Sequence, residues 1–172
     1  MDLQITLAHG TPREVETSQC LLGLIYRYNL SPYTFTRLIR IEQGVVPHSH
    51  PVLTLNTLRR HAPEPLLPTY LHEQMHWKVT TRVRGTDLIS AMRSEFPSLP
   101  IEFPDGAGSE ESTYGHIAVC YEEYDALLHL LGEREATALL MAIRNTRYRA
   151  VYDLVLTRTE EIRKILTRIG FD

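Results

Sequence analysis

Residues 72–76 read His72-Glu73-Gln74-Met75-His76, an H-E-x-x-H pattern that restricts local structure more than any other part of the chain. In an α-helix, side chains four residues apart lie on one face, one turn above the other. Both imidazoles can then bind one zinc ion, and Glu73 can take a proton from a water that the metal activates. The pattern predicts a helical zinc site with His72 and His76 as ligands and Glu73 as general base.

The composition indicates a globular chain and argues against one class of partner. With 172 residues, the chain is long enough for a single domain with a core, which we expect to cover residues 1–172. Hydrophobic residues make up 43% and charged residues 23%, proportions usual for soluble proteins. The net charge of -3 argues against a nucleic-acid partner bound through phosphate contacts.

Several features favour a cytoplasmic protein. The first residues lack a basic region followed by an apolar run, so we expect no secretory signal. The two cysteines, Cys20 and Cys120, suggest neither a disulfide framework nor a zinc ribbon. No apolar stretch approaches the length of a membrane span, so no membrane partner is expected. The sequence does not indicate an oligomeric state.

Hydrophobic patterns predict a small sheet and a set of helices. Alternating apolar residues predict strands at residues 3–7, 33–43 and 52–57. A proline-rich connection is expected at residues 63–68. Helical spacing, with proline and glycine as boundaries, predicts helices at about residues 11–28, 69–81, 86–96, 113–131, 133–145 and 148–169. Together these elements predict an α+β fold, with a short, mostly antiparallel sheet packed on the H-E-x-x-H helix and several further helices.

The H-E-x-x-H at residues 72–76 resembles that of the zincin metallopeptidases, and the resemblance implies a small zincin-like domain. In zincins, a strand at the sheet edge lies just ahead of the motif helix and pairs with extended substrate. The resemblance gives this role to residues 52–57. Lys78 departs from the pattern, because zincins usually carry an apolar residue there. The metzincin subgroup is excluded, because it needs glycine and histidine where this chain has Val79 and Arg82.

A catalytic zinc site needs a third protein ligand, and the helix predicted at residues 113–131 carries the candidates. Glu123 shares a helix face with apolar residues and should point inward, whereas Glu122 lies on a mostly polar face and is expected in solvent. A buried carboxylate needs a partner, and a metal ion is one. We therefore predict His72, His76 and Glu123 as zinc ligands, a set that resembles the glutamate-type zincins.

His116 provides an alternative assignment of the third ligand. It lies seven residues before Glu123, about two helical turns, so both side chains share the inward face to within about 20°. In the first assignment His116 acts beside the metal without binding it. In the second, His116 is the ligand and Glu123 orients it. A surface salt bridge for Glu123 is a third, non-functional interpretation.

The predicted chemistry is zinc-dependent hydrolysis of a peptide or protein substrate. Glu73 accepts a proton from water and passes it to the leaving amine. The developing oxyanion needs a hydrogen-bond donor. His116 is the first candidate, and Tyr148 and Tyr152, four residues apart on a predicted helix, are the next. The predicted catalytic set is Glu73, His116 and Tyr152.

Two other functions remain open from the sequence. A zincin-like metal-binding domain without peptidase activity would act as a structural or protein-interaction module, with His116 closing the metal site as a fourth ligand. A metal-dependent hydrolase could also act on another kind of bond. His48 and His50 form an H-x-H before the presumed edge strand. They are either loop residues or contacts to substrate or to a second metal.

Overall fold

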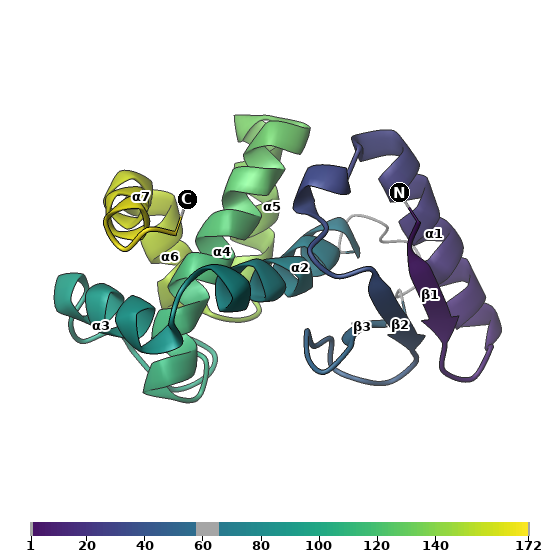
Figure 1. Cartoon of the computed structure of the whole chain (residues 1–172), viewed down its shortest axis with the longest axis horizontal. Helices are drawn as coiled ribbons and strands as arrows, with labels where there is room; N and C mark the ends of the chain where they lie inside the picture. Colours follow the sequence, from purple (N-terminus) through teal and green to yellow (C-terminus); the bar gives the residue numbers. More distant parts are fainter. Residues whose placement is uncertain (1, 58–65, 172) are drawn as a thin grey trace. The chain divides into compact units, whose positions relative to one another are not determined.

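The computed structural model describes residues 2–57 and 66–171 (Figure 1). Of the connection predicted at residues 63–68, residues 63–65 lie outside the described part of the chain. Residues 66–68 belong to a helix instead, which begins at Leu66. The α+β character expected from the sequence is confirmed. The elements in chain order are β1 (Gln4–Leu7), α1 (Pro12–Tyr28), a 3₁₀ turn (Ser31–Tyr33), β2 (Leu38–Glu42), β3 (Leu53–Asn56), α2 (Leu66–Arg82), α3 (Gly85–Glu95), α4 (Glu110–Leu131), α5 (Glu133–Arg144), α6 (Arg149–Thr157) and α7 (Thr159–Arg168).

The chain divides into two compact units, Met1–Trp77 and Lys78–Asp172. We call the first the sheet unit, because it contains the three strands, and the second the helical unit, because it contains α3 to α7. The boundary falls inside α2, so this helix contributes residues to both units. That residues 1–172 behave as a single domain therefore stays a prediction.

The sheet corrects one expectation from the sequence. Its strand order is β1-β2-β3, and both pairings are parallel, so the mostly antiparallel sheet predicted above is wrong. Ile5 lies opposite Ile39, which in turn lies opposite Leu53. Hydrophobic alternation finds strands because it reports which side chains are buried, but it carries no information about strand direction.

The connections explain the parallel arrangement. Helix α1 leads the chain back from the end of β1 to the start of β2, as parallel neighbours require. Residues 43–52 return the chain to the start of β3 without a helix. Within that return, the backbones of His48 and Thr54 form an isolated antiparallel bridge, with N–H···O distances of 3.0 and 2.8 Å. Antiparallel pairing is thus confined to one bridge beside β3 among the described residues.

A buried carboxylate fixes the start of α1. Thr11 caps the helix, and its side chain and that of Glu14 form a capping box. Glu14 is fully buried and accepts hydrogen bonds from the backbone N–H groups of His9, Thr11 and Gln43, at 2.9, 3.2 and 3.1 Å. Because Gln43 directly follows β2, one side chain links the β1–α1 connection to the end of the neighbouring strand.

Helix α4 is the centre of the helical unit. It contacts α3, α5, α6 and α7, and thirteen of its residues are buried. The predicted single helix at residues 148–169 is wrong, because the chain breaks at Arg158 between α6 and α7. On either side of the break, the hydroxyls of Thr157 and Thr159 donate to backbone carbonyls four residues earlier, a pattern that bends helices. No helix in the described parts of the chain is long and apolar enough to cross a membrane.

Candidate metal centre

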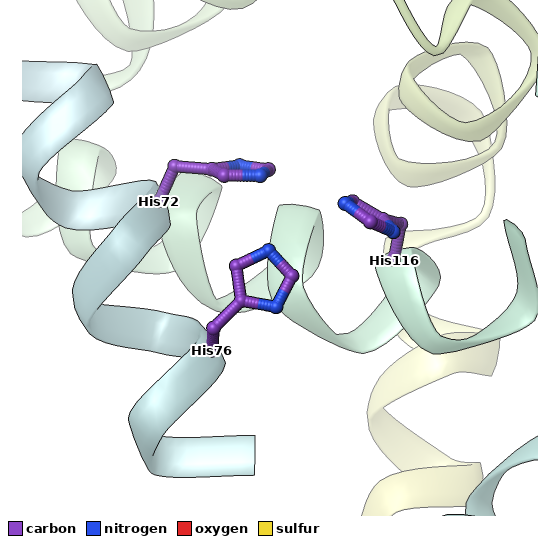
Figure 2. A group of neighbouring side chains, drawn as sticks. All are labelled: His72, His76 and His116. Carbon is purple, nitrogen blue, oxygen red and sulfur yellow. The ribbon is translucent and has the colours of Figure 1, made fainter. Parts of the chain in front are cut away.

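The H-E-x-x-H pattern lies on a helix, as predicted. Helix α2 spans Leu66–Arg82, somewhat longer than the expected 69–81. The rings of His72 and His76 lie with their centroids 5.0 Å apart and their planes at 76° (Figure 2). His72 and Glu73 are buried, with 3% and 6% of their surface exposed, and His76 is partly buried. The two imidazoles therefore project from successive turns of one helix, as a shared metal ion requires.

The opposite side of α2 is attached to the sheet unit. Tyr70, Gln74 and Trp77 follow the i, i+4, i+7 spacing of one helix face, and Gln74 lies about 180° around the helix from the two histidines. The Tyr70 hydroxyl lies 2.6 Å from that of Thr34, and the Trp77 indole N–H donates to the carbonyl of Ser49 at 2.9 Å. These bonds orient the helix so that its other side carries the histidines.

Gln74 makes three of these attachments. Its side-chain oxygen accepts from the backbone N–H groups of Phe35 and Thr36 at 2.8 and 2.9 Å, and its amide donates to the carbonyl of Thr36 at 2.9 Å. The side chain is fully buried. A single residue within the motif therefore satisfies three backbone groups ahead of β2.

We expect the substitution Gln74→Ala to lower the free energy of unfolding by about 3 kcal/mol, because it removes three partly buried hydrogen bonds to the backbone. Urea unfolding of the metal-free protein, followed by circular dichroism, measures this change. The matched control is Gln19→Ala on the exposed side of α1, which should change the stability by less than about 0.5 kcal/mol. Equal stabilities for the two variants would contradict the anchoring role of Gln74.

The H-x-H residues have local contacts in the sheet unit. His48 is exposed, and its Nδ1 lies 3.0 Å from the carbonyl of Val46. His50 stacks on Trp77 with ring centroids 4.3 Å apart. Neither histidine joins a group of three potential metal ligands within the described residues. The interpretation of His48 and His50 as loop residues is the simpler one.

His116 lies on α4, and contacts with Ser112 hold its Nδ1. Its Nδ1 lies 2.7 Å from the carbonyl of Ser112 and 3.3 Å from the Ser112 hydroxyl. Because a carbonyl oxygen only accepts, Nδ1 carries the proton and Nε2 presents a lone pair. Burial lowers the pKa of His116, although its bond to Ser112 and the charge of Glu123 act in the other direction. A neutral imidazole held by a backbone carbonyl is the form that binds zinc.

Glu123 points into the helical unit, as its position on the helix predicts. It is fully buried, and its Oε2 accepts a hydrogen bond from the hydroxyl of Tyr152 at 2.9 Å. Burial raises the pKa of Glu123 to about 7, and the charge of Arg147 and the Tyr152 hydrogen bond oppose the rise. The hydroxyl of Tyr152, predicted as an oxyanion donor, thus donates to Glu123. The ring of Tyr148, the other candidate donor, lies against His116 with ring centroids 4.5 Å apart.

Glu122 differs from its expected place. Predicted to be in solvent, it is only 7% exposed and forms an ion pair with Lys78. The Lys78 ammonium also lies 5.2 Å from the centre of the Phe171 ring. The ammonium of Lys78 offsets part of the cost of burying the carboxylate, and the polarity of the helix face alone did not reveal this partner. The pair also accounts for lysine at position 78, where the zincin pattern has an apolar residue.

Among the residues that the structure describes, two groups of side chains have ligand atoms close enough to hold a metal ion. His72, His76 and His116 form one group (Figure 2), and His72, Cys120 and Glu123 form the other. Within each group the ligand atoms lie within 4.8 Å of one another. Imidazole, thiolate and carboxylate are the ligands that zinc binds in proteins, so both groups fit this ion.

Cys120 and Arg147 were not singled out from the sequence. Cys120 is fully buried three residues before Glu123, on the same helix face, and its apolar neighbours made it look like a packing residue. Burial raises the pKa of the Cys120 thiol well above its usual value. Only the i, i+3 spacing to Glu123 could have indicated a shared site.

Comparison with protein-family models, with curated proteins and with solved structures finds no match to this chain. No relative therefore transfers an activity to it. The functional assignment depends on the chemistry of the residues themselves, above all on His72, Glu73 and His76.

Proposed function

We propose that this chain is a zinc-dependent hydrolase, a small cytoplasmic metallopeptidase that acts on peptide or protein substrates. The observation that carries the proposal is the group formed by His72, His76 and His116, whose ligand atoms lie within 4.8 Å of one another. Three imidazoles leave one coordination position for water or substrate, the arrangement of catalytic zinc sites. Glu73, next to the first histidine, supplies the carboxylate that such sites use as a base.

The third ligand in this proposal is His116, the alternative considered above. Its Nδ1 bond to Ser112 favours coordination through Nε2, and it belongs to the same group as both motif histidines. Glu123, the ligand first expected from the sequence, belongs to a group with His72 and Cys120. In the proposed site Glu123 does not bind the metal and keeps its hydrogen bond from Tyr152. The set His72, His76 and Glu123 stays a prediction. The zinc affinities of His116→Ala and Glu123→Gln distinguish it from the set with His116.

Zinc at this position would polarise a substrate carbonyl and lower the pKa of water. Glu73 would accept a proton on a carboxylate oxygen and later deliver it to the leaving amine. The carboxylate of Glu73 is then ionised again, as it was before the reaction. Burial of Glu73 keeps bulk water away from this transfer. Tyr152 donates to Glu123, so Tyr148, whose ring lies 4.5 Å from that of His116, is the candidate donor to a developing oxyanion.

Metal analysis of the purified protein tests whether the chain binds zinc, on which the whole proposal depends. We expect elemental mass spectrometry to find one zinc ion per protein molecule, and we expect this zinc to remain after dialysis. The substitution His72→Ala should cause its loss. The control His129→Ala alters an exposed histidine on α4 and should keep the zinc. A protein that contains no zinc, and takes up none when zinc is added, would rule out the proposal.

A second function has one observation in its favour. His72 belongs to both groups of candidate ligands, one with His116 and the other with Glu123, although no single group among the described residues holds both. Four protein ligands would close the site and make the metal structural, as in a binding module without peptidase activity. X-ray absorption spectroscopy of the zinc-loaded protein separates the two functions. Three imidazoles and a water support the hydrolase, and four protein ligands support the module.

A further inference from the structure

Arg147 lies in the turn between α5 and α6 with its charged group partly buried. The guanidinium Nε is buried and makes no hydrogen bond within the described part of the chain. The Cζ atom lies 6.0 Å from the centre of the Tyr148 ring. Buried guanidinium N–H groups are normally paired, because an unpaired one loses its hydration without replacement. The Nε–H of Arg147 is therefore a donor that an acceptor would complete.

The groups around Arg147 are those of the candidate metal centre. Burial opposes its charge, yet interactions with Tyr152, Glu123, Tyr148 and Cys120 raise the pKa of Arg147 above its usual value. The positive charge of Arg147 in turn lowers the pKa of His116. Glu123 balances this charge, but its Oε2 accepts the hydrogen bond of Tyr152 rather than one from Nε. The Tyr148 ring, 6.0 Å from the Cζ atom of Arg147, lies 4.5 Å from the His116 ring, so the turn brings the guanidinium to the side of α4 that carries His116.

The backbone holds this turn in one conformation. Tyr148 adopts left-handed angles, φ 50° and ψ 41°, which are unfavourable for an aromatic residue. The N–H groups of Arg149 and Ala150 donate to the carbonyls of Pro104 and Asp105, at 3.0 and 3.1 Å, and that of Arg147 donates to Ile143 at 3.2 Å. These hydrogen bonds hold the backbone of the turn before any ligand binds. Binding to Arg147 therefore costs little additional conformational entropy in the backbone.

We infer that Arg147 binds the free C-terminal carboxylate of a peptide substrate, an inference that rests on the proposed function. A guanidinium offers parallel N–H donors that match the two oxygens of a planar carboxylate. In a peptide hydrolase, the anion that arrives with every substrate is the C-terminal carboxylate. Binding of this carboxylate beside the metal centre would place a peptide bond near the C-terminus of the substrate in position for cleavage. The substrate class is therefore short peptides or the C-terminal residues of longer ones, and blocked C-termini are excluded.

The test compares two ligands that differ only in this charge. N-acetyl-dialanine and its C-terminal amide are titrated into zinc-loaded Glu73→Gln protein by calorimetry, so that binding is measured without turnover. We expect the acid to bind at least about tenfold more tightly than the amide, the difference that a charge-assisted hydrogen bond supplies. Arg147→Met should abolish the difference. The control Arg149→Met, an exposed arginine two residues away, should preserve it. Equal affinities of the unsubstituted Arg147 protein for acid and amide overturn the inference.

A second measurement is independent of both zinc and folding of the variant. The Nε–H resonance of Arg147, assigned in ¹⁵N-labelled protein, should shift on saturation with N-acetylglycine and stay unchanged with its amide, in zinc-free and in zinc-loaded protein. If Arg147→Met does not fold, Arg147→Lys replaces it, with a weaker preference for the acid expected because lysine lacks the paired donors. Absence of zinc defeats the proposed function, whereas bound zinc with peptide cleavage but no preference for the acid defeats only the inference about Arg147.

Discussion

The substitution Glu73→Gln is expected to leave zinc bound and to reduce peptide cleavage by about 10²–10⁴-fold, the usual contribution of a general base. Glutamine matches the shape of glutamate but cannot accept the proton. His72 and His76 remain in place because α2 is held from its other side by Gln74 and its partners. The measurement is kcat on a fluorogenic dipeptide together with the zinc content of the same preparation.

A matched control makes this result specific. Glu16→Gln changes an exposed glutamate on α1 and should leave both kcat and zinc content unchanged. Cleavage by Glu73→Gln at the rate of the parent protein would show that Glu73 is not the base. Loss of zinc together with activity would instead show that Glu73 supports the metal site.

The second large effect concerns the third ligand. We expect His116→Ala to weaken zinc binding by more than about 100-fold, which exceeds the 10–100-fold typical of residues that only support a ligand. Glu123→Gln should fall within or below that supporting range, because its carboxylate lies beside the ligands in the proposed site. Zinc affinity is measured by competition with a chromophoric chelator at fixed pH.

The order of the two affinities decides between the ligand sets. The control His129→Ala, on the same helix but exposed, should bind zinc as the parent does. If Glu123→Gln binds zinc more weakly than His116→Ala, the set His72, His76 and Glu123 predicted from the sequence is correct. Comparable losses of more than about 100-fold in both variants would support a closed site with four protein ligands.

Most elements could be predicted from the sequence, because their signals are local. Thr11-Pro12 marks the start of α1 through capping and proline geometry, and Gly132 marks the end of α4. Strand direction depends on how residues 43–52 return the chain, which no local pattern encodes. The break at Arg158 was missed for a similar reason, because no proline or glycine marks it.

The candidate site was predictable where one helix supplies the geometry. The spacing of His72 and His76 and the inward direction of Glu123 follow from helical periodicity alone. The Lys78–Glu122 pair joins residues far apart in the chain, so the burial of Glu122 could not be derived from its own helix face. Arg147 was missed because it lies in a turn, where no periodic pattern indicates which way a side chain points.

The attachment of Gln74 also affects how distant relatives of this chain could be recognised. The two middle positions of an H-E-x-x-H are usually treated as free, but here the first of them carries three backbone hydrogen bonds on the side of α2 away from the histidines. Trp77, just after the motif, bonds to Ser49 from the same side. A search pattern written as H-E-Q-x-H-W should therefore select chains that share this helix anchorage, and omit those that share only the metal ligands.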